Sequence, residues 1–202
     1  LDQTPFYPEG GGQVGDSGVL TSEDGAIVSV FDTKKENNLI VHFLNELPKT
    51  LDGTFQAKVK SSTRLDTQRN HTATHLLHES LREVLGNHVE QKGSLVKAQA
   101  LRFDFSHFSK VTADELQQIE SLVNQRIQIN YALEEHRDLP LEEAKKRGAM
   151  MLFGEKYGER VRMIGFGKSK ELCGGTHSPA TGALGLFRIT QETAVASGIR
   201  RI

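Results

Sequence analysis

The spacing of apolar residues changes once along the chain, near residue 61. Before this point, short runs of alternating apolar and polar residues predict strands over residues 26–33, 39–44 and 54–60. Phe55, Ala57 and Val59 show this alternation most clearly. Glycine-rich turns interrupt the beginning of the chain, as expected between short strands. We therefore expect residues 1–61 to form a small β-barrel subdomain.

Beyond this point, apolar residues recur three or four positions apart, which is the period of a helix with one buried face. Leu77, Leu81 and Leu85 form such a stripe, and Gly86 suits the end of that helix. A capping-box pattern, Thr112-Ala113-Asp114-Glu115, predicts the start of a second helix. Further runs predict strands over residues 101–106, 131–137, 161–164 and 184–189, and a short helix over residues 140–148. This irregular alternation of strands and helices indicates an α+β domain over residues 62–202.

The composition is that of an ordinary globular chain, with 37% hydrophobic and 25% charged residues. The sequence contains no apolar run long enough to cross a bilayer and no basic-then-apolar leader, which argues against a membrane protein. Its single cysteine, Cys173, cannot form an internal disulfide, so we expect a reducing, cytoplasmic environment. The chain begins at Leu1 without methionine, and we expect it to be a segment of a longer protein.

The net charge is −1, so the chain lacks the excess of basic residues that is typical of a protein that binds nucleic acid on its own. Basic residues are nevertheless clustered just before the predicted first helix and at its start. They are Lys58, Lys60, Arg64 and Arg69. Two interpretations stay open for this cluster: a solvated face, or a local contact with nucleic-acid phosphates.

Two short motifs far apart in the sequence carry candidate chemistry. His71 and His75 are four residues apart on a predicted helix, so both imidazoles can face one ion. Cys173 and His177 have the same separation and add a thiolate and a third imidazole. Nitrogen and sulfur ligands of this number suit tetrahedral zinc, whereas calcium and magnesium prefer oxygen.

Other interpretations of these residues remain open at the level of sequence. Cys173 could be a small buried residue near unrelated histidines, or a nucleophile paired with a histidine. His78, seven residues after His71, could be a substitute ligand or a partner of one. The sequence argues against a zinc protease, because Thr72 stands where that chemistry needs the glutamate of His-Glu-x-x-His.

Six short motifs follow one another along the chain, at residues 1–7, 10–13, 70–78, 91–94, 102–105 and 173–177. In this order they resemble the editing region of alanyl-tRNA synthetases, and the resemblance covers essentially the whole chain. Freestanding alanyl-tRNA editing proteins share the histidine and cysteine motifs. The stretch over residues 135–158 is more similar to the bacterial-type synthetase itself. The resemblance implies a small β-barrel followed by the α+β editing fold that threonyl-tRNA synthetases also have.

The resemblance also implies an activity, a metal and roles for individual residues. It implies hydrolysis of Ser-tRNA(Ala) and Gly-tRNA(Ala), with Ala-tRNA(Ala) spared, as part of an alanine–tRNA ligase. Zn²⁺ is expected on His71, His75, Cys173 and His177. Thr74 and Gln91 are expected to orient water and substrate. Candidates for substrate binding are Ser94, Gln13, Arg64 and Arg69, the two arginines because of their charge.

Two alternatives to this function stay open: a freestanding deacylase, and a zinc-stapled module that only docks tRNA. The partners expected are mischarged tRNA(Ala) and the rest of a synthetase chain. A closed set of four protein ligands is typical of structural zinc, whereas catalytic zinc keeps one position open. The sequence leaves the choice between catalytic and structural zinc open.

Overall fold

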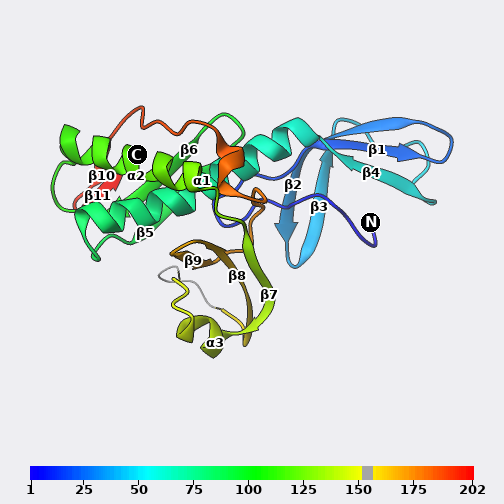
Figure 1. Ribbon diagram of the computed structural model, residues 1–202. Coiled ribbons are helices and arrows are strands. Elements are labelled where there is room, and N and C mark those ends of the chain that lie inside the picture. The colour runs from blue at the N-terminus through cyan, green and yellow to red at the C-terminus, as the bar shows by residue number, and fades with distance from the viewer. Residues whose placement is uncertain (152–156) are drawn as a thin grey trace.

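The fold is described from a computed structural model, which covers residues 1–151 and 157–202. Within these ranges, three separate sheets and two long helices build the molecule (Figure 1). The predicted α+β class is confirmed. Residues 152–156, which belong to the stretch that resembles bacterial synthetases, lie outside the described residues. No helix in the described ranges is both long and apolar enough to span a membrane.

The first sheet is antiparallel and contains β1 (Gly18–Ser22), β2 (Ile27–Glu36), β3 (Leu39–Leu44) and β4 (Phe55–Val59), in the order β3-β2-β1-β4. The predicted barrel is wrong, because β3 and β4 are the two edges of an open sheet. A break in register between Val30 and Asp32 divides β2. Its first half pairs with β1 and its second half with β3, so the sheet splays instead of closing. Phe6, Leu20 and Val30 form its small core.

The helix that carries the histidine motif is α1 (Ser61–Leu85), the longest helix of the described chain. It ends at Gly86, whose φ of 112° is costly for any residue with a side chain. Leu76, Leu77 and Leu81 are fully buried on its inner face. The predicted stripe and its glycine stop are therefore confirmed.

The second sheet contains β5 (Gln91–Val96), β6 (Leu101–Ser106), β10 (Thr193–Ala196) and β11 (Ile199–Arg201), in the order β10-β11-β6-β5. Helix α2 (Ala113–Ile129) starts at the predicted capping box, where Thr112 Oγ1 accepts from the Glu115 amide. Both helices pack on this sheet through a core that includes Phe103 and Phe105 (Figure 1). This core is what fixes the position of α1.

The third sheet contains β7 (Glu134–Pro140), β8 (Arg160–Phe166) and β9 (Ser169–Leu172), with α3 (Leu141–Lys146) following β7. The strand predicted over residues 184–189 is wrong: a short 3-10 helix, η1 (Thr181–Leu184), is followed by irregular chain. The Asn124 side chain of α2 holds this chain by bonds to both backbone groups of Phe187. Side chains of α2 thus replace the strand partner that the prediction required.

Candidate metal centre

Four side chains from two distant segments meet beside α1. His71 and His75 come from the buried face of α1, while Cys173 and His177 come from the loop after β9. Their ligand atoms all lie within 4.8 Å of one another. Cys173 Sγ is 3.5 Å from His71 Nε2 and 3.3 Å from His177 Nε2. The structure therefore brings the four predicted ligands into one group that could hold a metal.

The loop after β9 can approach α1 this closely because of a glycine. A Cβ on Gly175 would lie 2.0 Å from His71 Cε1, a distance that real atoms cannot adopt. The Arg162 side chain of β8 fixes the same loop by donating to the carbonyls of Cys173 (2.9 Å) and Gly175 (2.6 Å). The neighbouring Gly174 is exposed, and nothing lies within 4 Å of its Cβ position.

Gly175→Ala is expected to displace His71 and to weaken the metal centre. Overpacking of this kind should lower the free energy of unfolding by about 1–3 kcal/mol and weaken zinc binding. Chelator competition and urea unfolding measure the two effects. Gly174→Ala, in the same loop, is the control and should behave like the unmodified chain. Equal zinc affinity for the two variants would contradict the expected clash.

Each histidine of the group has a partner for its outer ring nitrogen. His71 Nδ1 is 2.7 Å from Gln13 Oε1, and His75 Nδ1 is 3.1 Å from Glu171 Oε2. His177 Nδ1 is 3.3 Å from Thr72 Oγ1. Because an outer acceptor holds the proton on Nδ1, the Nε2 lone pair faces inward, as a metal ligand requires.

The charges of the group also suit a cation. Burial raises the pKa of the Cys173 thiol, but the charge of His71 and hydrogen bonds from His177 outweigh it and hold that pKa well below its usual range. Burial is the main cause that lowers the pKa of His177 to about 3; the charges of His71 and His75 add to it, and Cys173 opposes it. For His75, burial also lowers the pKa, but the Glu171 carboxylate overrides it and raises the value to about 10.

A buried thiolate and a buried carboxylate thus carry two negative charges, of which the proton on one imidazole neutralises only one. A dication bound to the inward Nε2 atoms and the thiolate would take over this neutralising role. The mixture of imidazole and thiolate donors fits zinc best among common biological dications. The residues present therefore fit the expected metal.

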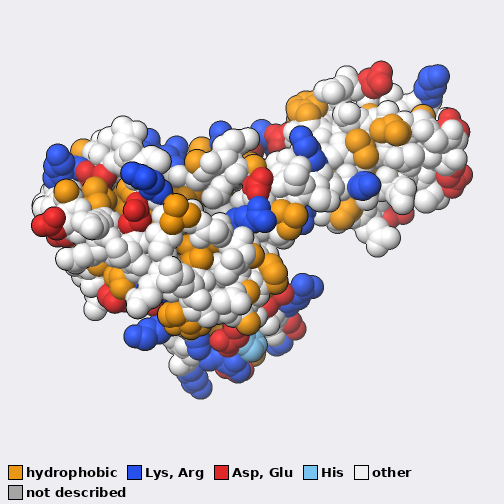
Figure 2. Space-filling view, turned by 45° about the horizontal axis from the view of Figure 1, so that its top comes forward, with side chains coloured by type: hydrophobic (Ala, Val, Ile, Leu, Met, Phe, Trp, Pro, Cys, Tyr) orange, Lys and Arg blue, Asp and Glu red, His pale blue; other side chains and the backbone are white. Residues whose placement is uncertain are grey.

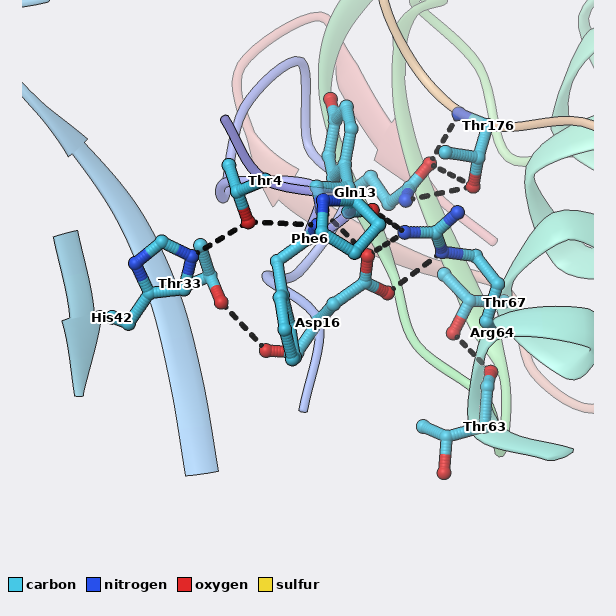
Figure 3. Close-up of polar contacts among 12 residues, drawn as sticks. Thr4, Phe6, Gln13, Asp16, Thr33, His42, Thr63, Arg64, Thr67 and Thr176 are labelled. Atoms are coloured by element: carbon cyan, nitrogen blue, oxygen red, sulfur yellow. Dashed lines mark hydrogen bonds and ion pairs between the residues drawn. The ribbon is translucent and has the colours of Figure 1, made fainter. Parts of the chain in front are cut away.

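The N-terminal segment reaches the centre through Gln13, which is fully buried (Figure 3). Its Oε1 also accepts from the Thr176 amide at 2.9 Å, and its Nε2 is 3.0 Å from Thr176 Oγ1. The backbone beside it bonds to the end of β5, with Gly12 O accepting from Val96 N at 2.8 Å. A Cβ on Gly12 would lie 2.0 Å from Ser94 Oγ. Gln13 was predicted as a candidate for substrate binding, and in the structure it lies against His71, one of the predicted ligands.

The two predicted catalytic residues lie on different elements. Thr74 is buried on α1, and its Oγ1 donates to Asn70 O at 2.9 Å. Gln91 lies at the first position of β5, with its Nε2 3.4 Å from Ser94 Oγ. The structure thus brings Gln91 to Ser94, and Ser94 to the glycine loop that carries Gln13.

The two predicted tRNA-binding arginines have protein partners on the N-terminal segment, on α1 and on η1. Arg64 forms an ion pair with Asp16 (Figure 3). It also donates to Pro5 O at 3.0 Å. Arg69 is 2.7 Å from Asp66 and donates to Ala183 O at 3.0 Å. Figure 2 shows basic and acidic side chains interspersed on the visible face, without one large basic patch.

Neither the role of Glu171 nor the contact between Thr72 and His177 was predicted from the sequence. Glu171 is 6% exposed, which is unusual for a carboxylate. Its place two residues before Cys173 is the signal in the sequence. The sequence gives a weaker indication for Thr72, because a threonine between two histidines is common in helices and need not contact a ligand.

The chain is similar to known proteins at both of its ends and along its whole length. Residues 161–202, which include the cysteine motif, match the family described as threonyl and alanyl tRNA synthetase second additional domain. Residues 1–68 match the class II (A) tRNA synthetases. The whole chain is 57% identical to an alanine–tRNA ligase of Porphyromonas gingivalis and 58% identical to those of Parabacteroides distasonis and Christiangramia forsetii. The resemblance to alanyl-tRNA synthetase is confirmed.

The alignment covers all 202 residues of this chain but only 23% of each of these three ligases. The chain thus spans about a quarter of the alanyl-tRNA synthetases that it matches. Its two matched segments, at opposite ends of the sequence, both contact α1: Gln13 bonds to His71, and Glu171 bonds to His75. One matched segment thus supplies Cys173 and His177, and the other supplies Gln13, the partner of His71.

Proposed function

We propose that this chain is the editing part of an alanyl-tRNA synthetase and hydrolyses the ester of Ser-tRNA(Ala) and Gly-tRNA(Ala), sparing Ala-tRNA(Ala). The observation that carries the proposal is the His/Cys group in a chain that matches alanine–tRNA ligases along its full length. The rest of the synthetase polypeptide is the partner that would charge the tRNA.

The need for such an activity follows from the size of alanine. A pocket for alanine cannot exclude the smaller glycine, and one extra small group on serine is worth only about 1–3 kcal/mol of discrimination. A second site must therefore remove the errors. This site can exclude alanine if it contains buried polar groups that hydrogen-bond to the serine hydroxyl. The methyl group of alanine would leave these groups without a partner, at a desolvation cost.

The residues of the centre have distinct roles in this proposal. His71, His75, Cys173 and His177 would hold Zn²⁺. When bound, zinc supplies a Lewis acid that can polarise an ester carbonyl or acidify water. We assign Thr74 and Gln91 to orienting water and the aminoacyl ester, and Ser94, beside Gln91, to the serine side chain.

Contact with the tRNA backbone is assigned to the basic residues near the start of α1. Arg64 and Arg69 remain the proposed phosphate contacts, and each would exchange or share a protein partner on binding. Arg69 is the better placed, because its side chain is 46% exposed, against 21% for Arg64. Both fit a weak, salt-sensitive contact in a chain of net charge −1.

A second candidate function is a zinc-stapled tRNA-docking module without its own catalysis. One observation favours it: four protein ligands fill a tetrahedral site, which is the usual arrangement of structural zinc. Hydrolysis would instead require one ligand to give way to water or substrate. The two functions differ in whether the zinc-loaded chain releases the amino acid at all.

The direct test is deacylation of Ser-tRNA(Ala), Gly-tRNA(Ala) and Ala-tRNA(Ala) by the purified, zinc-loaded chain. The editing function expects release of serine and glycine well above the spontaneous rate, with alanine retained. Binding of tRNA without release of any amino acid would support the docking module. Equal release of all three amino acids would overturn the proposed specificity.

Gln91→Ala is expected to slow hydrolysis of Ser-tRNA(Ala) by about 10–100-fold, because the amide is assigned to orientation near the ester. Zinc content and melting temperature should stay unchanged, since Gln91 is half-buried and lies outside the hydrophobic core. Single-turnover deacylation, metal analysis and thermal melting measure these three quantities. Gln118→Ala, at an exposed position of α2, is the matched control and should leave all three unchanged. A rate equal to that of the control would remove Gln91 from the mechanism.

A further inference from the structure

Glu171 on β9 holds two histidines at once. Its Oε2 is 3.1 Å from His75 Nδ1 and its Oε1 is 3.0 Å from His78 Nδ1. All three side chains are nearly excluded from solvent, with 7% of the Glu171 side chain exposed. A buried carboxylate is stabilised only by such hydrogen bonds and by nearby positive charge.

The two imidazoles face different surroundings beyond the carboxylate. His75 lies in the group that could hold a metal, together with Cys173. His78 packs its ring against Phe103, with centroids 5.2 Å apart, and its Nε2 is buried without a hydrogen-bond partner in the described part of the chain. One carboxylate thus holds one candidate ligand and one histidine that faces the hydrophobic core.

The helix alone does not determine which histidine reaches the metal. His71 has neighbours on the same face at four and seven positions along α1, which are His75 and His78. Both are buried, and both would suit a metal ligand chemically. A rotation of either side chain, or a small shift of the helix, would change the ligand set. A contact from outside the helix is needed to determine which of the two histidines binds the metal.

We propose that Glu171 is the positioning residue that makes His75, rather than His78, a ligand of the metal centre. It does so by binding both Nδ1 atoms at once, which fixes the two rings. The His75 ring then presents Nε2 to Cys173, and the His78 ring is directed to Phe103. The inference rests on the proposed metal centre and adds a residue beyond its four ligands.

The principal test is Glu171→Gln, which keeps the size of the side chain and removes its second acceptor. An amide oxygen can accept from one Nδ1–H, but the amide nitrogen cannot accept from the other. Zinc affinity, measured by chelator competition, should fall about 10–100-fold, as for other partners of metal ligands. The matched control is Glu134→Gln in the same sheet, where the carboxylate also contacts a histidine, His136, at 3.0 Å. It should bind zinc like the unmodified chain.

The absorption spectrum of the Co²⁺-loaded chain gives a readout that a general loss of stability would not produce. In Glu171→Gln the ligand-field bands should broaden or shift, because the orientation of one imidazole is no longer fixed. The Glu134→Gln spectrum should match that of the unmodified chain. An unchanged affinity and an unchanged Co²⁺ spectrum in Glu171→Gln would overturn the proposal.

A second pair of variants tests the choice of ligand and does not depend on Glu171→Gln folding. His75→Gln should lose most zinc binding, whereas His78→Gln should keep the thiolate–Co²⁺ charge-transfer band and lose little affinity. Equal losses in the two variants would overturn the selection of His75. If the unmodified chain binds no zinc, the metal centre itself fails. A chain that binds zinc yet tolerates Glu171→Gln refutes only the role of Glu171.

Discussion

Cys173→Ala is expected to remove nearly all zinc from the chain. The thiolate is the only anionic ligand of the group, and without it three imidazoles must hold a dication alone. Loss of a partner outside the ligand set costs about 10–100-fold in affinity, so loss of a ligand should cost more than about 100-fold. The melting temperature of the zinc-loaded chain should fall as well, because zinc binds the folded state preferentially.

Metal analysis after dialysis, together with thermal melting with and without added zinc, measures the effect. The control is His136→Ala, which removes a histidine that lies outside the group. This variant should retain about one zinc per chain and the melting temperature of the unmodified protein. Full zinc content in Cys173→Ala would show that the thiol is only a buried side chain, which is the interpretation left open by the sequence.

The second large effect is expected at the contact between the two long helices. Arg126 of α2 is 8% exposed and points into α1. Its Nε is 3.0 Å from Glu79, its second terminal nitrogen is 2.5 Å from Glu83, and it donates to Ser80 Oγ at 2.8 Å. Arg126→Met leaves the mostly buried Glu79 carboxylate unpaired, so the free energy of unfolding should fall by about 3–5 kcal/mol.

Burial, and not the ion pair as such, is the reason for this magnitude. Arg147 of the chain forms an ion pair with Glu143 at the end of α3, where both side chains are well exposed. Arg147→Met should therefore cost less than about 1 kcal/mol. Urea unfolding of both variants makes the comparison. Similar losses for Arg126→Met and Arg147→Met would show that the α1–α2 contact does not depend on this pair.

The long helices could be predicted from the sequence because local signals determine their ends. The Leu77, Leu81 and Leu85 stripe marked the buried face of α1, and the capping box at Thr112 marked the start of α2. Strand β3 was predicted with the same bounds that the structure has, from a short run of apolar residues. Such signals act over a few residues and need no knowledge of the rest of the chain.

The arrangement of the strands depended on contacts that no local pattern contains. Strand β1 begins at Gly18, within the glycine-rich start of the chain that was interpreted as turns. Strands β10 and β11 are too short for their period to be recognised. The barrel was predicted from strand content alone, but the register break within β2 opens the sheet. Over residues 184–189, an exposed Leu186 and the bonds from Asn124 replaced the predicted pairing.

In the candidate site, likewise, the residues in local motifs could be predicted and the residues brought in by distant segments could not. Its four ligands stand in two compact motifs, and the structure brings them together. The residues that contact these ligands lie on other segments. Gln13 is on the N-terminal segment, and Glu171 is on β9, a strand that was not predicted. Glycine spacing gave no sign that Gly175 leaves room for His71, because that role depends on which helix the loop meets.

The long separation between the parts of the centre determines the order in which it can form. His71 meets Cys173 across 102 residues, and Gln13 meets Thr176 across 163 residues. At about 5–20 residues per second, the helix motif leaves the ribosome about 5–20 s before the cysteine does. During this interval only two of the four candidate ligands, both imidazoles, are available. Bringing them next to the other two then costs the entropy of closing a long loop. Capture of the proposed metal would therefore be a late event in the biogenesis of this chain, because the four candidate ligands are all available only after synthesis has passed His177.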